Sequence, residues 1–145
     1  MSKENRVAYP NPSDMPVSWI ASDYVSALVV AALHRPDLAG ANWPVSGLEN
    51  PDGPSLAQAF TAGLGRDITY YAMPPQDFGG ILDQAFGPGA GAAAAGEYQK
   101  LWDNPAQRPN FQADMDEVLR KLPISMTGIS DWVAQHQAAF SAAGR

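Results

Sequence analysis

The sequence predicts an α/β protein in which about five to six helices are combined with three short strands. Short runs rich in β-branched and aromatic residues, of which "DITYYAM" at 67–73 is the clearest, are typical of strands. Longer runs with apolar residues every three or four positions are typical of helices. Thirteen prolines and thirteen glycines divide the 145 residues into many short elements.

The composition limits the classes of partner and of chemistry. The net charge is −6, and lysine and arginine form no basic stripe, which argues against DNA or RNA as a partner. The absence of cysteine excludes disulfides and thiolate chemistry and is typical of a reducing, cytoplasmic location, which we expect here. No apolar run approaches the roughly 20 residues that cross a bilayer, and we expect neither a membrane span nor a signal peptide.

The chain is expected to consist of a polar N-terminal segment, residues 1–14, and a single domain, residues 15–145. The segment is rich in turn residues, and Pro10 and Pro12 lie close together in it. Within it, "RVAY" at 6–9 is a candidate edge strand.

The first part of the domain predicts a strand followed by a buried helix. "PVSWIA" at 16–21 is the strand, and Ser22 or Asp23 then offers an oxygen to the free N–H groups of a helix start. The helix continues to about His34, and valine, leucine and alanine occupy nearly every side of it. A helix that is apolar nearly all round is expected to be buried on more than one side.

The middle of the chain predicts a second strand and two further helices. "ANWPVSG" at 41–47 is the strand, and Pro44, which lacks an N–H group, indicates an edge position or a strand start. Asp52 is a plausible cap for a helix that ends at Gly65. After the third strand, Pro75 favours the first turn of the next helix.

Three helices are predicted in the last third of the chain. The first covers about 90–102, and the second lies within 111–123. Thr127 is expected to cap the last helix. The stripe on one side of that helix comprises Ile129, Trp132, Val133, His136 and Phe140.

The motifs that would carry cofactor or metal chemistry are incomplete. "GPGAG" at 87–91 follows a helix and lacks the full G-x-G-x-x-G spacing, so it predicts a helix stop and a loop. His34 and His136 lie near helix ends without the spacing of a metal site, and we expect no metal. A Tyr-x-x-x-Lys pair is absent, because Tyr98 and Lys100 are only two positions apart.

Tyr70 and Tyr71 are expected to point to opposite faces of one strand, because side chains alternate along a strand. One of them would then lie in the core and the other would face a pocket. We take Tyr71 as the pocket candidate.

The order of several segments resembles the substrate-side, C-terminal half of NmrA-like proteins. These segments are "VSWIASDYVSALVVAALHRPDLAGANWPVSG", "GLGRDITYYAMPPQDF" and "FGPGAG", and the resemblance covers about residues 7–140. NmrA-like proteins are atypical short-chain dehydrogenase/reductases, related to NAD(P)-dependent epimerases and dehydratases. The resemblance implies a partial Rossmann-type protein that lacks the N-terminal nucleotide-binding half.

The resemblance also implies where a cofactor and a substrate would bind. The full-length family uses NAD(P), but the Gly-rich turn belongs to the other half, so no cofactor is expected for this chain alone. In the family, "NWPVS" would belong to the Rossmann sheet, and "PVSWIA" and "DITYYAM" would belong to the substrate lobe. Together with Tyr71, the candidates to face a substrate are Trp19, Met73, Phe78 and Trp102.

Three functions are compatible with these observations. In the first, the chain is the substrate-binding half of an NAD(P)-dependent oxidoreductase-type protein, truncated or split, and is not catalytic alone. Its exposed apolar surface would pack on a Rossmann-half partner chain or form a homodimer. In the second, it is a stand-alone homodimeric module that binds a small hydrophobic or polar organic ligand. In the third, it is a cofactor-independent enzyme on the same lobe.

Overall fold

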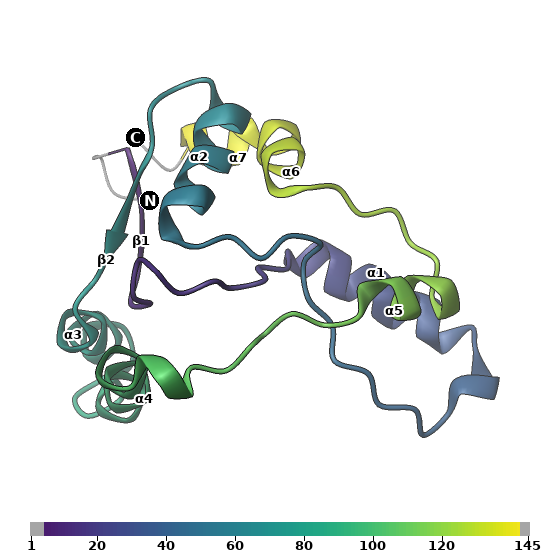
Figure 1. The fold of residues 1–145 in the computed structure, drawn as a ribbon, viewed down its shortest axis with the longest axis horizontal. Helices are drawn as coiled ribbons and strands as arrows, with labels where there is room; N and C mark the ends of the chain where they lie inside the picture. Colours follow the sequence, from purple (N-terminus) through teal and green to yellow (C-terminus); the bar gives the residue numbers. More distant parts are fainter. Residues whose placement is uncertain (1–4, 143–145) are drawn as a thin grey trace.

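The computed structural model describes residues 5–142, which form an α/β arrangement with a two-stranded parallel sheet (Figure 1). In chain order the elements are β1 (Arg6–Tyr9), α1 (Ser22–Leu33), α2 (Gly53–Leu64), β2 (Thr69–Ala72), α3 (Pro75–Phe86), α4 (Ala92–Asp103), α5 (Met115–Lys121), α6 (Ile129–Gln135) and α7 (Gln137–Ala142). Short 3₁₀ turns at Pro36–Leu38 and Pro105–Gln107 follow α1 and α4. Long irregular segments connect the groups of helices.

The sheet joins the N-terminal residues to the middle of the chain. β1 runs parallel to β2, and Val7 is opposite Tyr70 in the register. The candidate edge strand at 6–9 and the strand expected within 67–73 are both confirmed. Helix α2 precedes β2 and packs against it, so the chain crosses over between the two parallel strands through helical structure.

The strands predicted at 16–21 and 41–47 are wrong, because both segments are irregular and neither belongs to a sheet. They still lie next to each other, since the Gly47 N–H donates to the Ser18 carbonyl at 3.4 Å. A Cβ at Gly47 would collide with the Trp19 carbonyl, so the close approach requires glycine. Pro44 has no N–H group to donate, and the single long hydrogen bond between the two segments is not enough to form a β-ladder.

Helix α1 buries one side against α5. Leu28 on α1 forms a core cluster with Met115, Val118 and Leu122 from α5 and its C-terminal end. The α5 residues follow the apolar spacing that the sequence predicted, and Asp114 caps the helix by accepting from the Glu117 N–H. In Figure 1 the two helices lie side by side, away from the sheet.

The opposite side of α1 is exposed, contrary to the expectation that this helix is buried on more than one side. The exposed fractions are 54% for Val29, 55% for Val30 and 77% for Leu33, and Val25 is also exposed. Val29, Val30 and Leu33 fall on the side of the helix that points away from Leu28, and Val25 lies at the edge of this side. The four residues Val25, Val29, Val30 and Leu33 are called the outer face of α1 below.

Helix α2 begins and ends as its sequence predicted. The Asp52 carboxylate accepts from the Ser55 N–H at 2.9 Å, and hydrogen bonding from Ser55 lowers the pKa of this carboxyl group. Gly65 ends the helix in the left-handed conformation with φ of +66°. On its other side α2 packs against α6, and Gly63 leaves room there for Val133, which is fully buried.

The final predicted helix is divided in two, which raises the number of α-helices in residues 5–142 to seven. α6 ends at Gln135, and His136 separates it from α7. Thr127 is not the cap of α6, because its N–H and hydroxyl groups bond to Tyr24 instead. The cap residue is Gly128, and the first N–H of the helix, from Ile129, is bound by the Glu49 carboxylate of a distant loop.

The "GPGAG" segment joins α3 to α4, as expected for a helix stop followed by a loop. Gly87 and Gly89 have positive φ values of +102° and +89°. The Gly91 N–H donates to the Asp83 carboxylate at 2.8 Å and anchors the loop. The backbones of Gly79 and Gly91 touch, since a Cβ at either position would crowd the other helix.

A search of the helices within the described part of the chain finds none with both the length and the apolar character needed to cross a bilayer.

We predict that Gly91→Ala lowers the free energy of unfolding by about 1–3 kcal/mol, because the added methyl group collides with the Gly79 backbone. Gly96→Ala on α4 is the matched control. Nothing lies near that position, so removal of a helical glycine should stabilise the protein by about 0.5–1 kcal/mol. Urea denaturation of the three proteins measures both changes. Equal stabilities of the two variants would contradict the close α3–α4 contact.

Candidate functional site

A cavity of about 260 Å³ lies where β1, the start of α1, α2 and α6 approach one another. Its wall also includes the loops before α1, α2 and α6, so segments from nearly the whole length of the chain meet there. Most of the wall is apolar, with aliphatic side chains such as Val7, Leu56 and Met126. An apolar pocket with a few polar groups is the usual form of a small-molecule site.

Aromatic side chains form much of the wall. They are Tyr9, Trp19, Tyr24, Phe60 and Trp132. Tyr9 and Trp19 meet edge to face with ring centroids 4.8 Å apart, which fixes the corner between β1 and the segment before α1. The rings come from β1, a loop, α1, α2 and α6, so each element contributes one ring.

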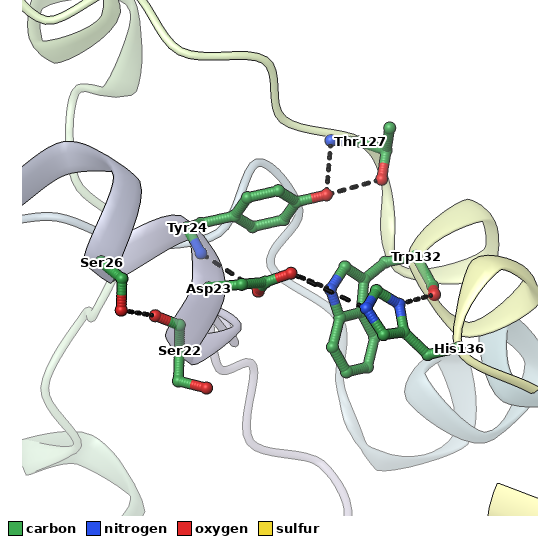
Figure 2. A network of polar contacts seen from close by, with 7 residues as sticks. All are labelled: Ser22, Asp23, Tyr24, Ser26, Thr127, Trp132 and His136. Atoms are coloured by element: carbon green, nitrogen blue, oxygen red, sulfur yellow. Dashed lines mark hydrogen bonds and ion pairs between the residues drawn. The ribbon is translucent and has the colours of Figure 1, made fainter. Parts of the chain in front are cut away.

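The Tyr24 hydroxyl connects two sides of the cavity (Figure 2). It accepts a hydrogen bond from the Thr127 N–H at 3.0 Å and shares a second bond, of 2.8 Å, with the Thr127 hydroxyl. Because the oxygen already accepts from the backbone, the phenolic hydrogen is free to be donated to Thr127. The start of α1 is thereby joined to the segment that leads into α6.

A second group of contacts joins α1 to α6 on the same side (Figure 2). The Trp132 indole N–H donates to the Asp23 carboxylate at 3.1 Å. The His136 ring stacks on Trp132 with centroids 4.2 Å apart, and its Nδ1 lies 2.8 Å from the Trp132 carbonyl. Since a carbonyl only accepts, Nδ1 carries the hydrogen. The His136 Nε2 lies 3.8 Å from Asp23 and pairs with it when the ring is protonated.

Among residues 5–142, the charged side chain on the cavity wall is Glu49. No lysine or arginine of these residues lines the cavity. Glu49 is exposed, and one of its oxygens accepts from the Ile129 N–H at the start of α6. A carboxylate has lone pairs for several donors, so Glu49 has capacity for a further hydrogen bond. The electrostatic character of the cavity is therefore negative.

Two tyrosines near the cavity are held in the neutral form. Burial, followed by the nearby Tyr9, raises the pKa of Tyr70 to about 12, and Tyr70 donates to the Asn11 carbonyl at 3.1 Å. Burial, with a hydrogen bond to Tyr9, also raises the pKa of Tyr98, whose hydroxyl lies 3.0 Å from that of Tyr9. Neither phenol is poised to act as a base near neutral pH.

The cavity combines a large apolar surface with few polar groups. Within residues 5–142 no three His, Cys, Asp or Glu side chains gather in a way that could hold a metal ion. Glu49 and the Tyr24 hydroxyl, the polar groups best placed on the wall, each accept a hydrogen bond from the backbone of the segment at 127–129. The geometry thus provides an apolar, aromatic space with a carboxylate at one side.

The structure separates the residues that the sequence suggested for substrate contact. Trp19 lines the cavity, whereas Tyr71, Met73, Phe78 and Trp102 are outside its wall. Tyr71 lies under the Arg6 guanidinium at 4.4 Å, and the Met73 N–H donates to the Tyr9 carbonyl.

Phe78 belongs to a second aromatic cluster around Tyr9, and Trp102 is bound to the backbone next to that residue. The Phe78 ring is 5.3 Å from that of Tyr98 and 6.1 Å from that of Tyr9. The Trp102 indole N–H donates to the Pro10 carbonyl at 2.9 Å. Contact of these residues with a substrate stays a prediction.

Sequence reasoning did not single out Tyr24, Glu49, Thr127 or Trp132 as site residues. Trp132 belonged to an apolar stripe that indicated core packing, and Thr127 was interpreted as a cap. Glu49 lies in a turn-rich segment without any motif. The signal available in the sequence was the pairing of Asp23 and Tyr24 at a helix start, where polar groups are free to bond across to another segment.

Comparisons with known proteins support the fold. No protein-family model matches the chain, and no curated protein matches it. Among solved structures it is similar to a nucleoside-diphosphate-sugar epimerase from Staphylococcus aureus, with a TM-score of 0.63 and 19% identity. The match covers 90% of this chain and 43% of the epimerase, so the chain spans less than half the length of that protein.

At this identity the likeness shows the fold alone. It agrees with the general α/β class that the sequence predicted.

We predict that Tyr24→Phe lowers the free energy of unfolding by about 1–2 kcal/mol, because it leaves the part-buried Thr127 N–H without its partner. Tyr71→Phe is the matched control. No hydrogen bond of the Tyr71 hydroxyl is found within residues 5–142, so the change should stay within about 0.5 kcal/mol. Thermal or urea denaturation gives both values. An unchanged stability in Tyr24→Phe would show that this bond does not hold α1 to the segment before α6.

Proposed function

We propose that this chain is the substrate-binding half of an NmrA-like, NAD(P)-dependent oxidoreductase-type protein, and that it is not catalytic alone. The observation that carries the proposal is the outer face of α1. Four large aliphatic side chains are exposed on a helix whose other side already packs against α5. Such a face fits a helix that normally lies between two layers, of which one belongs to this chain.

The outer face of α1 is unusual in being continuous. Val25, Val29 and Leu33 are four residues apart and therefore follow one line along the helix, with Val30 beside them. The line continues into a groove formed with Pro36 and the half-buried Trp43 beyond the end of α1. Full burial of each aliphatic side chain would contribute about 1.5–3 kcal/mol, so a partner surface would gain several kcal/mol here.

The proposed occupant of this face is a nucleotide-binding half of the Rossmann type. Support comes from the similar epimerase, of which this chain covers only 43%. Further support comes from the segment order that resembles the substrate side of NmrA-like proteins. Docking of a second copy of this chain on the same face is the alternative, and it would make the protein a homodimeric binding module.

The proposal assigns NAD(P) to the other half. The Gly-rich "GPGAG" segment joins two helices, and a dinucleotide loop would instead follow a strand and open a helix. Among the described residues, the cavity wall has the carboxylate of Glu49 and no lysine or arginine that could bind a pyrophosphate. These residues do not fit the cofactor, and we assign the aromatic cavity to the substrate.

We predict that Leu33→Glu suppresses association through the outer face of α1. For the unmodified chain we expect dye binding to exposed apolar surface and concentration-dependent association, measured by anilinonaphthalene sulfonate fluorescence and sedimentation velocity. Leu33→Glu should weaken both by about tenfold. The control is Phe86→Glu at the end of α3, because Phe86 is 78% exposed and Leu33 is 77% exposed.

The control variant should behave as the unmodified chain. The docking role of the outer face would be contradicted if the unmodified chain is a monomer that unfolds cooperatively and binds no dye, and if Leu33→Glu behaves in the same way. A discrete dimer abolished by Leu33→Glu would favour the homodimeric module. Co-expression with the product of the adjacent upstream reading frame, followed by a mass measurement, tests the two-half assembly directly.

We also predict that the isolated chain gives no saturable signal in fluorescence titrations with NADH or NADPH. The physical reason is that the cavity wall supplies no cation for the phosphates of either nucleotide. A tight complex of one nucleotide per chain would contradict the assignment of the cofactor to another half.

A further inference from the structure

We infer that the cavity binds a compact, mainly apolar molecule that carries a positive charge, and that it does not bind a nucleoside-diphosphate sugar. That this molecule is the substrate rests on the proposed function, but its binding to the cavity does not. The inference depends on the size of the cavity, on its charge and on the rings that line it.

The volume limits the ligand. At about 260 Å³ the cavity is slightly smaller than the roughly 300–1,000 Å³ of sites that bury drug-sized molecules. A fused bicyclic ring with a one-atom arm is of suitable size. A nucleoside-diphosphate sugar has many more non-hydrogen atoms than such a bicyclic molecule and would extend out of the cavity.

The charge of the wall selects against phosphates. Proteins bind diphosphates with arginine, lysine, a metal ion or the N–H groups at a helix N-terminus. The described residues place neither lysine nor arginine on this wall, and Glu49 would repel a diphosphate. The start of α1 also reaches the wall, but Asp23 in its first turn puts a carboxylate at the helix start, which accepts from the Tyr24 N–H. This second carboxylate is outside the wall and lies beside the edge of the Trp132 ring. The chain as a whole has a net charge of −6, which acts in the same direction.

The same features favour a cation. Aromatic faces attract organic cations, and indole does so most strongly. Trp132 donates its N–H to the Asp23 carboxylate, and this bond polarises the indole toward a more negative ring. His136 stacks against the Trp132 ring from one side, which holds the indole plane in a fixed orientation.

Glu49 provides the counter-charge for an ammonium group. It lines the same cavity as Tyr24 and Trp132, and its bond to the Ile129 N–H fixes the carboxylate at the start of α6. A carboxylate that is already oriented loses less entropy when it binds a ligand. The ring of an aromatic amine would pack among the apolar side chains while its ammonium group meets Glu49.

The test uses four probes in isothermal titration calorimetry on the full chain. They are 2-(aminomethyl)naphthalene, which is cationic at pH 7, the neutral 2-(hydroxymethyl)naphthalene, the anionic 2-naphthoate, and UDP-glucose. We expect the amine to bind about tenfold more tightly than the alcohol, and we expect no measurable binding of 2-naphthoate or UDP-glucose. Indole N–H signals in NMR spectra locate the site, and those of Trp19 and Trp132 should shift while that of Trp43 should not.

Glu49→Gln tests the charge without removing the hydrogen bond at the start of α6, because the amide oxygen can still accept from the Ile129 N–H. This variant should lose about tenfold in affinity for the amine and keep its affinity for the alcohol. Glu97→Gln on α4 is the matched control, since Glu97 is exposed and pairs with Lys100 away from the cavity. It should bind both probes as the unmodified chain does.

Several results would overturn the inference. They are tighter binding of UDP-glucose or 2-naphthoate than of the amine, equal binding of amine and alcohol, or no binding of any naphthyl probe. If Glu49→Gln does not fold, the comparison of the four probes on the unmodified chain still decides. Failure of the proposed function can be distinguished from failure of this inference. If the chain binds the amine but does not associate through the outer face of α1, the two-half assembly is contradicted and the cavity assignment stands.

Discussion

The hydrogen bonds between the Tyr24 hydroxyl and Thr127 are the contact on which the rest of the arrangement depends. They join residues 103 positions apart and connect two groups of helices, one built on α1 and α5 and the other on α2 and α6. A two-stranded sheet is too small to organise seven helices by itself. Polar contacts from single side chains therefore decide how the groups are placed, and the cavity lies between the elements that they join.

The helices were largely predictable, because their determinants are local. Asp52 and Gly65 mark the ends of α2 through interactions with neighbouring residues, and the apolar spacing of α5 matches its buried side. The two wrong strands have a non-local cause. The segments at 16–21 and 41–47 have the composition of strands, but a strand also needs partners with free N–H groups, and prolines remove some of them. The apolar periodicity also predicted one continuous last helix and gave no sign of the division at His136.

The candidate site was much less predictable than the fold. Of the five residues selected for substrate contact, Trp19 alone lines the cavity. Tyr24, Glu49 and Trp132 meet there because three loops bring their elements together, and no spacing in the sequence encodes that meeting. For the outer face of α1, the failed prediction is itself informative. Its apolar residues indicated burial, and their exposure in the structure is what supports a partner surface.

The distribution of the cavity wall along the chain has a consequence for how the protein folds. The wall includes residues from Val7 to Trp132. Forming it therefore costs the entropy of ordering long loops before the stabilising contacts of the wall are made. The hairpin of α3 and α4 joins two neighbouring helices and can form without the wall. The binding site is thus expected to be among the last regions to form and the first to open. A ligand that fills it would act on the whole chain by mass action, and it would raise the stability of the regions that are least stable on their own.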